Sequence, residues 1–396
     1  MKKKYDTAVL FVIIMIMVVS TAGILHVSAD NNVNSGSIEG HWYCYTIEGY
    51  DSQGEFSSHE GNIAEELTLW IDEDVDPSLF YGVYSSEEGE VDITGIVVNG
   101  VVECQFVLAD QGYVIRGQIN SRLDAVALVV SIEDKDGGSH LYYCNYLKYG
   151  GRGVPVLFKN MTIESEWVLK YAATVNSDNE MMAVSIESLV VTECKDKVFR
   201  GFMNWDGDEV TVQGAFIYHS SVWSGLMTDD LGNVWYLRIN DNTMTVMSFD
   251  ASNATATKCV FTSDDQEAIT YAASYTGDWV SDSVVVLSSK GETVTLEYGT
   301  LSIRMPQSSD PVQNNNKLNL MSAIVQSNME NSYGKEVGSV SVHEGLMNIR
   351  FLTVNEDRFG KVSGWFSPDG EKLYLYGIFV YDGQYYSECI VMQKVH

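Results

Sequence analysis

The sequence has few residues that interrupt strands or bind polyanions, and it lacks the motifs of the common enzyme classes. Five prolines occur in 396 residues, and no long segment has helical apolar spacing. The 24 lysines and arginines against 54 acidic residues give a formal charge of −30, which repels nucleic acid and attracts basic partners. No Gly-x-Ser-x-Gly elbow, His-Glu-x-x-His, phosphate-binding loop or dinucleotide fingerprint occurs. The sequence therefore predicts a non-enzymatic protein, with an acidic extracellular hydrolase as the least favoured alternative.

The N-terminal residues 1–29 have the pattern of a secretory signal peptide. Three lysines at positions 2–4 precede an apolar stretch over 8–19, and Ala29 offers a cleavage position. An uncleaved membrane anchor is the alternative, since about 20 residues are needed to cross a bilayer. We expect an extracellular or cell-surface protein with no membrane span after cleavage, because no later segment is long and apolar enough.

The rest of the chain repeats one plan three times, over 30–150, 156–265 and 272–396. Each unit opens with a tryptophan and closes with a cysteine-bearing strand. The openings are Gly40-His41-Trp42, Ser165-Glu166-Trp167 and Gly277-Asp278-Trp279, and the closing cysteines are Cys144, Cys259 and Cys389. The plan predicts three tandem domains.

Each unit contains about eight short runs with strand-like alternation, separated by Gly, Asp and Asn turns. The fold class is therefore all-β, with three tandem antiparallel β-meander units. Eight strands can close into a barrel without free edges, although an open sandwich has the same sequence pattern. Residues 317–331 are the one segment where apolar spacing makes a short helix an alternative to a strand.

The Gly-x-Trp opening of units 1 and 3, leading into an eight-stranded meander, resembles the lipocalin and avidin class of β-barrels. That resemblance implies a tryptophan closing one barrel end and an apolar ligand in the interior, with Trp42, Trp167 and Trp279 as ligand-binding residues. Unit 2 departs from it, since Ser165 replaces the glycine. The alternative is that these tryptophans only fill the core. In its general features the chain also looks like secreted archaeal or bacterial envelope and sheath proteins.

Six cysteines lie in the exported part, where three disulfides are possible. The three units contain three, two and one of them, so at least one disulfide is expected to cross a unit boundary or to join two molecules. The candidates are Cys44, Cys104, Cys144, Cys194, Cys259 and Cys389. No Cys-x-x-Cys occurs, which argues against zinc or a redox centre.

No cofactor is predicted except Ca²⁺, for which alternating aspartates can offer oxygen ligands. The candidate ligands are Asp72, Asp74, Asp76, Asp134 and Asp136, although the glycine and glutamate of an EF-hand loop are missing. The alternative is that these runs are solvated loops. Asn160 and Asn253 fit the acceptor pattern for N-glycosylation.

Together these features favour a non-enzymatic secreted or cell-surface protein that acts by structural assembly or by binding over an extended surface. The expected partners are further copies of this chain or other envelope proteins, and not nucleic acid. The alternative function is a carrier that holds small apolar ligands inside lipocalin-like barrels.

Overall fold

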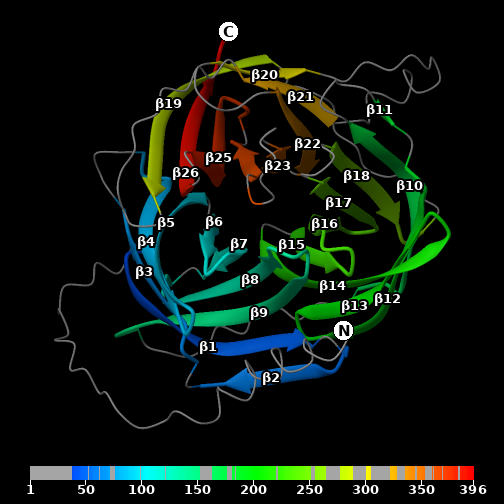
Figure 1. The fold of residues 1–396 in the computed structure, drawn as a ribbon, viewed down its shortest axis with the longest axis horizontal. Helices are drawn as coiled ribbons and strands as arrows, with labels where there is room; N and C mark the ends of the chain where they lie inside the picture. The colour runs from blue at the N-terminus through cyan, green and yellow to red at the C-terminus, as the bar shows by residue number, and fades with distance from the viewer. Residues whose placement is uncertain are drawn as a thin grey trace.

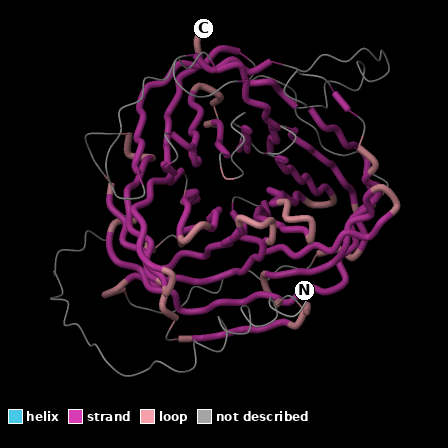
Figure 2. Tube along the Cα trace, viewed as in Figure 1, coloured by secondary structure: helices cyan, strands magenta, loops and turns pink. Residues whose placement is uncertain are grey.

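The described part of the protein consists only of strands and their connections (Figure 2). The computed structural model describes residues 38–51, 53–61, 63–71, 76–98, 100–120, 122–151, 163–175, 181–182, 184–219, 222–250, 255–264, 277–288, 300–304, 322–327, 335–343, 346–352, 359, 361–367, 369–381 and 384–396. The described residues confirm the all-β fold class. No helix in these ranges has the length and apolarity to cross a bilayer.

Barrel 1 is an antiparallel sheet that closes because its first strand, β1, also pairs with its last strand, β9. It contains nine strands instead of the expected eight. The strands are β1 (Gly40–Tyr50), β2 (Phe56–Glu60), β3 (Glu66–Trp70), β4 (Leu79–Ser86), β5 (Gly89–Val98), β6 (Val101–Leu108), β7 (Gln111–Ile119), β8 (Ala125–Asp134) and β9 (Ser139–Lys148).

The ninth strand arises because the second position of barrel 1 is divided. β2 pairs with residues 46–50 of β1, whereas β3 pairs with residues 40–43 of the same strand. β2 has a polar sequence with four of its five residues exposed, so it has no alternating apolar pattern by which it can be predicted. The interruption between the two strands admits the side chain of Glu65 to the barrel, as described below.

Barrel 2 repeats this arrangement, with β10 paired to β18 and the second position divided between β11 and β12. Its strands are β10 (Glu166–Val175), β11 (Met181–Met182), β12 (Ile186–Lys195), β13 (Val198–Trp205), β14 (Asp208–His219), β15 (Val222–Asp229), β16 (Val234–Asn240), β17 (Thr243–Asp250) and β18 (Thr255–Thr262). Asp206 and Gly207 join β13 to β14 with φ values of 53° and 85°. Positive φ at both residues is the requirement of a two-residue type I′ hairpin.

Barrel 3 is a closed barrel of eight strands, in which β19 pairs with β26. Its strands are β19 (Gly277–Ser288), β20 (Thr300–Arg304), β21 (Ser322–Ser327), β22 (Lys335–His343), β23 (Leu346–Leu352), β24 (Lys361–Phe366), β25 (Lys372–Tyr381) and β26 (Gln384–Lys394). β21 lies in the segment for which a short helix was an alternative, and it pairs on both sides with β20 and β22. Sheet pairing therefore prevails there over helical spacing.

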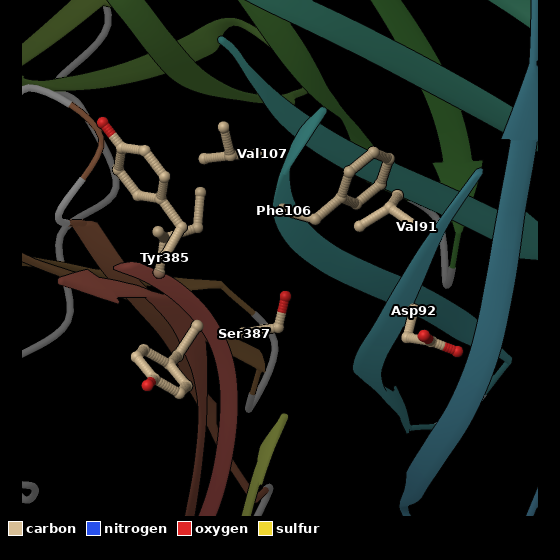
Figure 3. Close-up of a pocket in the computed structure, with 8 residues that line it drawn as sticks. Val91, Asp92, Phe106, Val107, Tyr385 and Ser387 are labelled. Carbon is tan, nitrogen blue, oxygen red and sulfur yellow. The ribbon is translucent and has the colours of Figure 1, made fainter. Parts of the chain in front are cut away.

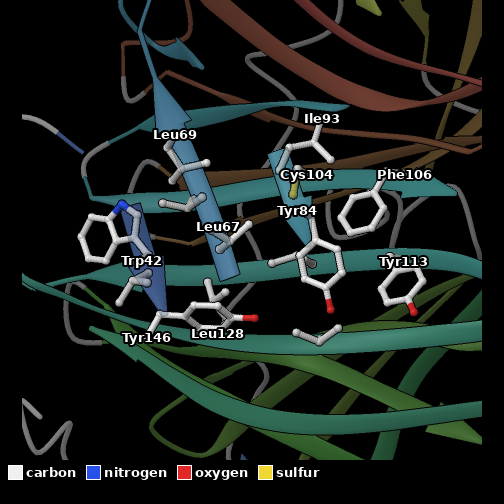
Figure 4. Close-up of a cluster of buried hydrophobic side chains, with 14 of the residues drawn as sticks. Trp42, Leu67, Leu69, Tyr84, Ile93, Cys104, Phe106, Tyr113, Leu128 and Tyr146 are labelled. Carbon is white, nitrogen blue, oxygen red and sulfur yellow. The ribbon is translucent and has the colours of Figure 1, made fainter. Parts of the chain in front are cut away.

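Apolar side chains fill the interiors of barrels 1 and 2. In barrel 1 they form a continuous cluster from Trp42 at one end to Tyr113 and Phe106 (Figure 4). A corresponding cluster around Trp167 and Trp235 fills barrel 2. Each large side chain buried in this way stabilises the fold by about 1.5–3 kcal/mol.

The three barrels surround a common centre, with barrel 1 at lower left, barrel 2 at right and barrel 3 at the top of Figure 1. Apolar residues of the outer barrel faces pack between barrels 1 and 2, where Val129 and Tyr143 meet Ile217 and Met247. A second apolar cluster, which includes Ile96, joins barrels 1 and 3.

Buried polar side chains meet where all three barrels come together. We call this group the central junction; it comprises Glu103, Gln105 and Arg116 of barrel 1, Ser224 and Tyr236 of barrel 2, and Ser363, Tyr376 and Ser387 of barrel 3. Each of these residues is at most 5% exposed. Hydrogen bonds between the barrels offset part of the free-energy cost of removing these groups from water, and Oε1 of Gln105 has no hydrogen-bond partner among the described residues. The junction therefore links the three barrels to one another.

Candidate functional site

The three predicted tryptophans are each at most 1% exposed. The indole nitrogens of Trp42 and Trp167 donate to nearby carbonyl oxygens, those of Ile38 and Glu164, both at 2.9 Å. Trp279 packs edge-on against Phe366, with ring centroids 5.2 Å apart. All three are core residues, and their role in ligand binding stays a prediction.

A lysine of the last strand explains the glycine of the Gly-x-Trp opening in barrels 1 and 3. The Lys148 ammonium lies 5.3 Å from the Trp42 ring, and that of Lys394 lies 5.8 Å from the Trp279 ring. Gly40 has a φ of +128°, and a Cβ there would lie 2.9 Å from Cε of Lys148. In barrel 2 Val168 pairs with Thr262, so the register sets Ser263 and not a lysine opposite Trp167, and the opening residue is Ser165.

The carboxyl group of Glu65 lies inside barrel 1 among tyrosine side chains. The sequence did not indicate this residue. It accepts hydrogen bonds from the hydroxyls of Tyr146 at 2.7 Å and Tyr142 at 3.2 Å, and also from Tyr84. Figure 4 shows the hydroxyls of Tyr84 and Tyr146 entering the same part of the barrel interior.

Burial among these rings raises the pKa of Glu65, and the hydrogen bonds from the tyrosines oppose that rise. The residue as a whole is partly exposed, whereas its carboxyl group is enclosed. A carboxyl group held by several hydroxyl donors can bind a proton or the cationic end of a small molecule.

A small hollow lies outside the barrels, between β5 and β6 of barrel 1 and β25 and β26 of barrel 3. Val91, Asp92, Phe106, Tyr385 and Ser387 are among its lining residues (Figure 3). Its volume is about 10 Å³, which accommodates about one water molecule. Drug-sized ligands need about 300 Å³ or more, so this hollow is not a site for them.

The predicted calcium ligands do not come together in the described part of the chain. Asp76 pairs with Lys372 of barrel 3 at 3.2 Å, and Asp134 accepts a hydrogen bond from Gln111 at 2.7 Å. Asp136 follows in a turn, whereas Asp72 and Asp74 lie outside the described residues. Within the described ranges no three His, Cys, Asp or Glu side chains are placed to hold a metal ion.

The structure holds all six cysteines as free thiols, and the disulfides expected from the sequence stay a prediction. Five thiols are buried and Cys194 is half-buried. The closing residues Cys144 and Cys259 lie in the separate cores of barrels 1 and 2, and Cys389 lies in the interface between barrels 1 and 3. Three, two and one cysteines in units 1, 2 and 3 are therefore compatible with reduced thiols buried in separate apolar clusters. Both glycosylation candidates, Asn160 and Asn253, lie outside the described residues.

Comparisons with known proteins give no family for this chain. No family model and no curated protein matches its sequence. A Nostoc punctiforme protein of unknown function from the DUF3598 family has a TM-score of 0.28 and 11% identity, over 57% of this chain and 95% of that one. A double mutant of transferrin binding protein B from Haemophilus parasuis has a TM-score of 0.22 and 8% identity, over 89% of this chain and 75% of that one. Transferrin binding protein B of Neisseria meningitidis has a TM-score of 0.20 and 9% identity, over 90% of this chain and 76% of that one.

Proposed function

We propose that this chain is an exported, non-enzymatic protein of the cell surface or the extracellular medium, which binds or assembles through the outer surfaces of its barrels. The observation that carries the proposal is the filling of the barrel interiors by side chains over the described residues of barrels 1 and 2. With the interiors of barrels 1 and 2 occupied and the central junction internally hydrogen-bonded, the outer surface is the part that we propose for partners.

Exposed apolar residues at equivalent positions of two barrels support binding along the length of the protein. Val168 follows Trp167 and is 55% exposed, and Val280 follows Trp279 and is 41% exposed. The corresponding residue of barrel 1 is Tyr43. A large side chain in contact with water at the same place in each unit is typical of an interaction surface. The proposed partners are further copies of this chain or other envelope proteins.

The state of the thiols supports a non-enzymatic function. Burial raises the pKa of Cys104, Cys144 and Cys259, which keeps these groups protonated near neutral pH. A protonated buried thiol is a poor nucleophile and a poor metal ligand.

A carrier of small ligands in barrel 1 is the second candidate, and the Glu65 carboxyl group favours it. A ligand with an amine could replace the tyrosine hydroxyls around this group, provided that the side chains of the cluster move apart. The outer-surface proposal requires no such movement.

Two measurements on the exported protein separate these candidates. Light scattering after size exclusion measures assembly, and titration with a hydrophobic fluorescent probe measures uptake into a barrel. We expect assembly without stoichiometric probe uptake. A one-to-one uptake that is altered in Glu65→Gln would favour the carrier and overturn the outer-surface proposal.

A further inference from the structure

Two tyrosine rings and a carboxylate converge on the outside of barrel 1. The rings of Tyr43 and Tyr149 have centroids 4.8 Å apart and are inclined by 48°. The Tyr149 hydroxyl donates to the Glu66 carboxylate at 2.9 Å, and Glu66 is the strand partner of Tyr43. Tyr149 is 50% exposed and Glu66 is also exposed, so ring faces and carboxylate are open to solvent together.

A third aromatic residue, Trp70, lies on the same face four residues along β3 from Glu66. It is 40% exposed, and its ring is nearly parallel to that of Tyr81, with centroids 6.5 Å apart. Four strand residues span about 13 Å, so Trp70 and the tyrosine pair mark the two ends of one surface. We call Tyr43, Glu66, Trp70 and Tyr149 the aromatic face.

The charge of this surface is negative. Tyr45 is placed beside the tyrosine pair on β1, and its hydroxyl hydrogen-bonds to Glu60. Around Glu66, the outward-facing side chains that β1, β3 and β4 contribute to the face are His41, Tyr43, Tyr45, Glu66, Thr68, Trp70, Tyr81, Val83 and Ser85, and none of them is lysine or arginine. Lys148 is 6% exposed and lies over Trp42.

We propose that the aromatic face binds a basic protein segment, and that one lysine or arginine side chain of the segment lies against the exposed faces of the tyrosine pair, beside the Glu66 carboxylate. An aromatic ring attracts a cation over its face, and an adjacent carboxylate adds a charge-assisted hydrogen bond. The tyrosine pair is held by its contact with Glu66, so little side-chain order has to be gained on binding. Trp70 provides a second, apolar contact along the segment.

The chemistry of the face distinguishes this partner from the other classes. Anionic polymers are repelled by the carboxylates and by the charge of −30 over the whole chain. A purely apolar partner would leave Glu66 without water or a cation, at a cost in free energy. The inference rests on the proposed function, because it assigns a partner to an outer surface and not to a barrel interior.

The test uses the whole exported protein and an octalysine peptide as the probe, by titration calorimetry at two salt concentrations. We expect Tyr43→Ala/Tyr149→Ala and Glu66→Gln each to raise the dissociation constant by about tenfold. Tyr149→Phe keeps the ring, loses the hydrogen bond and should give a smaller rise, which provides a result independent of any folding defect of the double variant.

Two matched controls measure general charge attraction. Glu209→Gln removes one exposed carboxylate on β14 of barrel 2, in another barrel than the face. Tyr218→Ala disrupts an aromatic pair on barrel 2 that has the same 4.8 Å separation, with Trp223. Both should leave the dissociation constant within about twofold of wild type. Equal weakening by the controls would overturn the aromatic face as a site.

The proposed function fails on a different result. If hydrophobic probe uptake occurs in the barrel while octalysine binding still depends on Tyr43 and Tyr149, the outer-surface function is wrong and the site remains. If uptake is absent and octalysine binds equally to all variants, the function stands and the site is wrong.

Discussion

The side-chain amide of Gln105 in barrel 1 donates to the hydroxyl of Ser363 in barrel 3 at 2.9 Å, across 258 residues of sequence. The same amide reaches the hydroxyl of Tyr236 in barrel 2 at 3.4 Å, and that hydroxyl lies 3.3 Å from the hydroxyl of Tyr376. One side chain therefore contacts both other barrels. Its removal should loosen the arrangement of the barrels more than the structure within any one of them.

Breaking the ion pair of the central junction should destabilise the protein strongly. Glu103 and Arg116 pair between neighbouring strands, and each is 1% exposed. Arg116→Met leaves a buried carboxylate without its cation and should lower the free energy of unfolding by about 3–5 kcal/mol. Urea unfolding of wild type and Arg116→Met measures this loss. The double variant Glu103→Leu/Arg116→Met should be less destabilised than Arg116→Met, and a strictly additive pair would contradict coupling.

The stability of the protein should depend on pH through Glu65. Its pKa in the folded protein is raised, so the folded state binds more protons than the unfolded state and stability falls as pH rises through that pKa. The free energy of unfolding of wild type relative to Glu65→Gln should therefore be larger at pH 4.5 than at pH 7.5. Urea titrations at both pH values measure the difference, and no change with pH would show that the carboxyl group is solvated.

Thiol labelling should distinguish Cys194 from the other five cysteines. Cys194 is half-buried, whereas the remaining thiols are buried and free. A thiol reagent at neutral pH should modify Cys194 first in the native protein and all six after unfolding, as measured by mass spectrometry. Disulfide-linked peptides from the non-reduced protein would contradict this and confirm the disulfides expected from the sequence.

Gly40, two residues before Trp42, should be required, whereas Ser165 at the same position of barrel 2 should be replaceable. Gly40→Ala meets an unfavourable φ and the side chain of Lys148, and should cost about 1–3 kcal/mol. Ser165→Ala, on an exposed residue, should change stability by less than about 0.5 kcal/mol. Thermal unfolding of the two variants provides the comparison, and equal losses would contradict the role of the glycine.

Limited proteolysis should cut near 149–155 and 263–275, where the sequence between the units is rich in glycine or charge. Because the central junction and the apolar interfaces join the barrels, the fragments should co-elute on size exclusion under native conditions. Fragments that separate without denaturant would show that the interfaces are weak, and fragments with ends inside a barrel would contradict the domain boundaries.

Sequence reasoning predicted the elements that repeat and missed the contacts that do not. The tryptophan openings and closing cysteines indicate the first and last strands of each unit, which is where Trp42 and Lys148 pair to close barrel 1. An outward polar residue such as Gln105 follows the same alternation whether it faces water or another barrel, so the central junction has no sequence signal.

Two other failures have local causes. Glu65 lies in the interruption between β2 and β3, where neither strand nor helix periodicity predicts which side chains are buried. The path of the folded chain directs its side chain into the barrel. The aromatic face combines residues from β1, β3 and the end of β9, which are distant in sequence and meet only when the barrel has closed.

The pairing of the first with the last strand of each barrel has a consequence for synthesis. β1 cannot complete its hydrogen bonds until β9 has been made, about a hundred residues later, and the same holds for β10 with β18 and β19 with β26. Contacts of such long sequence separation form slowly, and an unclosed barrel exposes strand edges that can pair with other chains. Because the chain is synthesised from its N-terminus, barrel 1 can close first, then barrel 2, and barrel 3 last. A truncation within one unit would leave that unit with two open edges, and the aggregation of such fragments is the expected failure of incomplete synthesis.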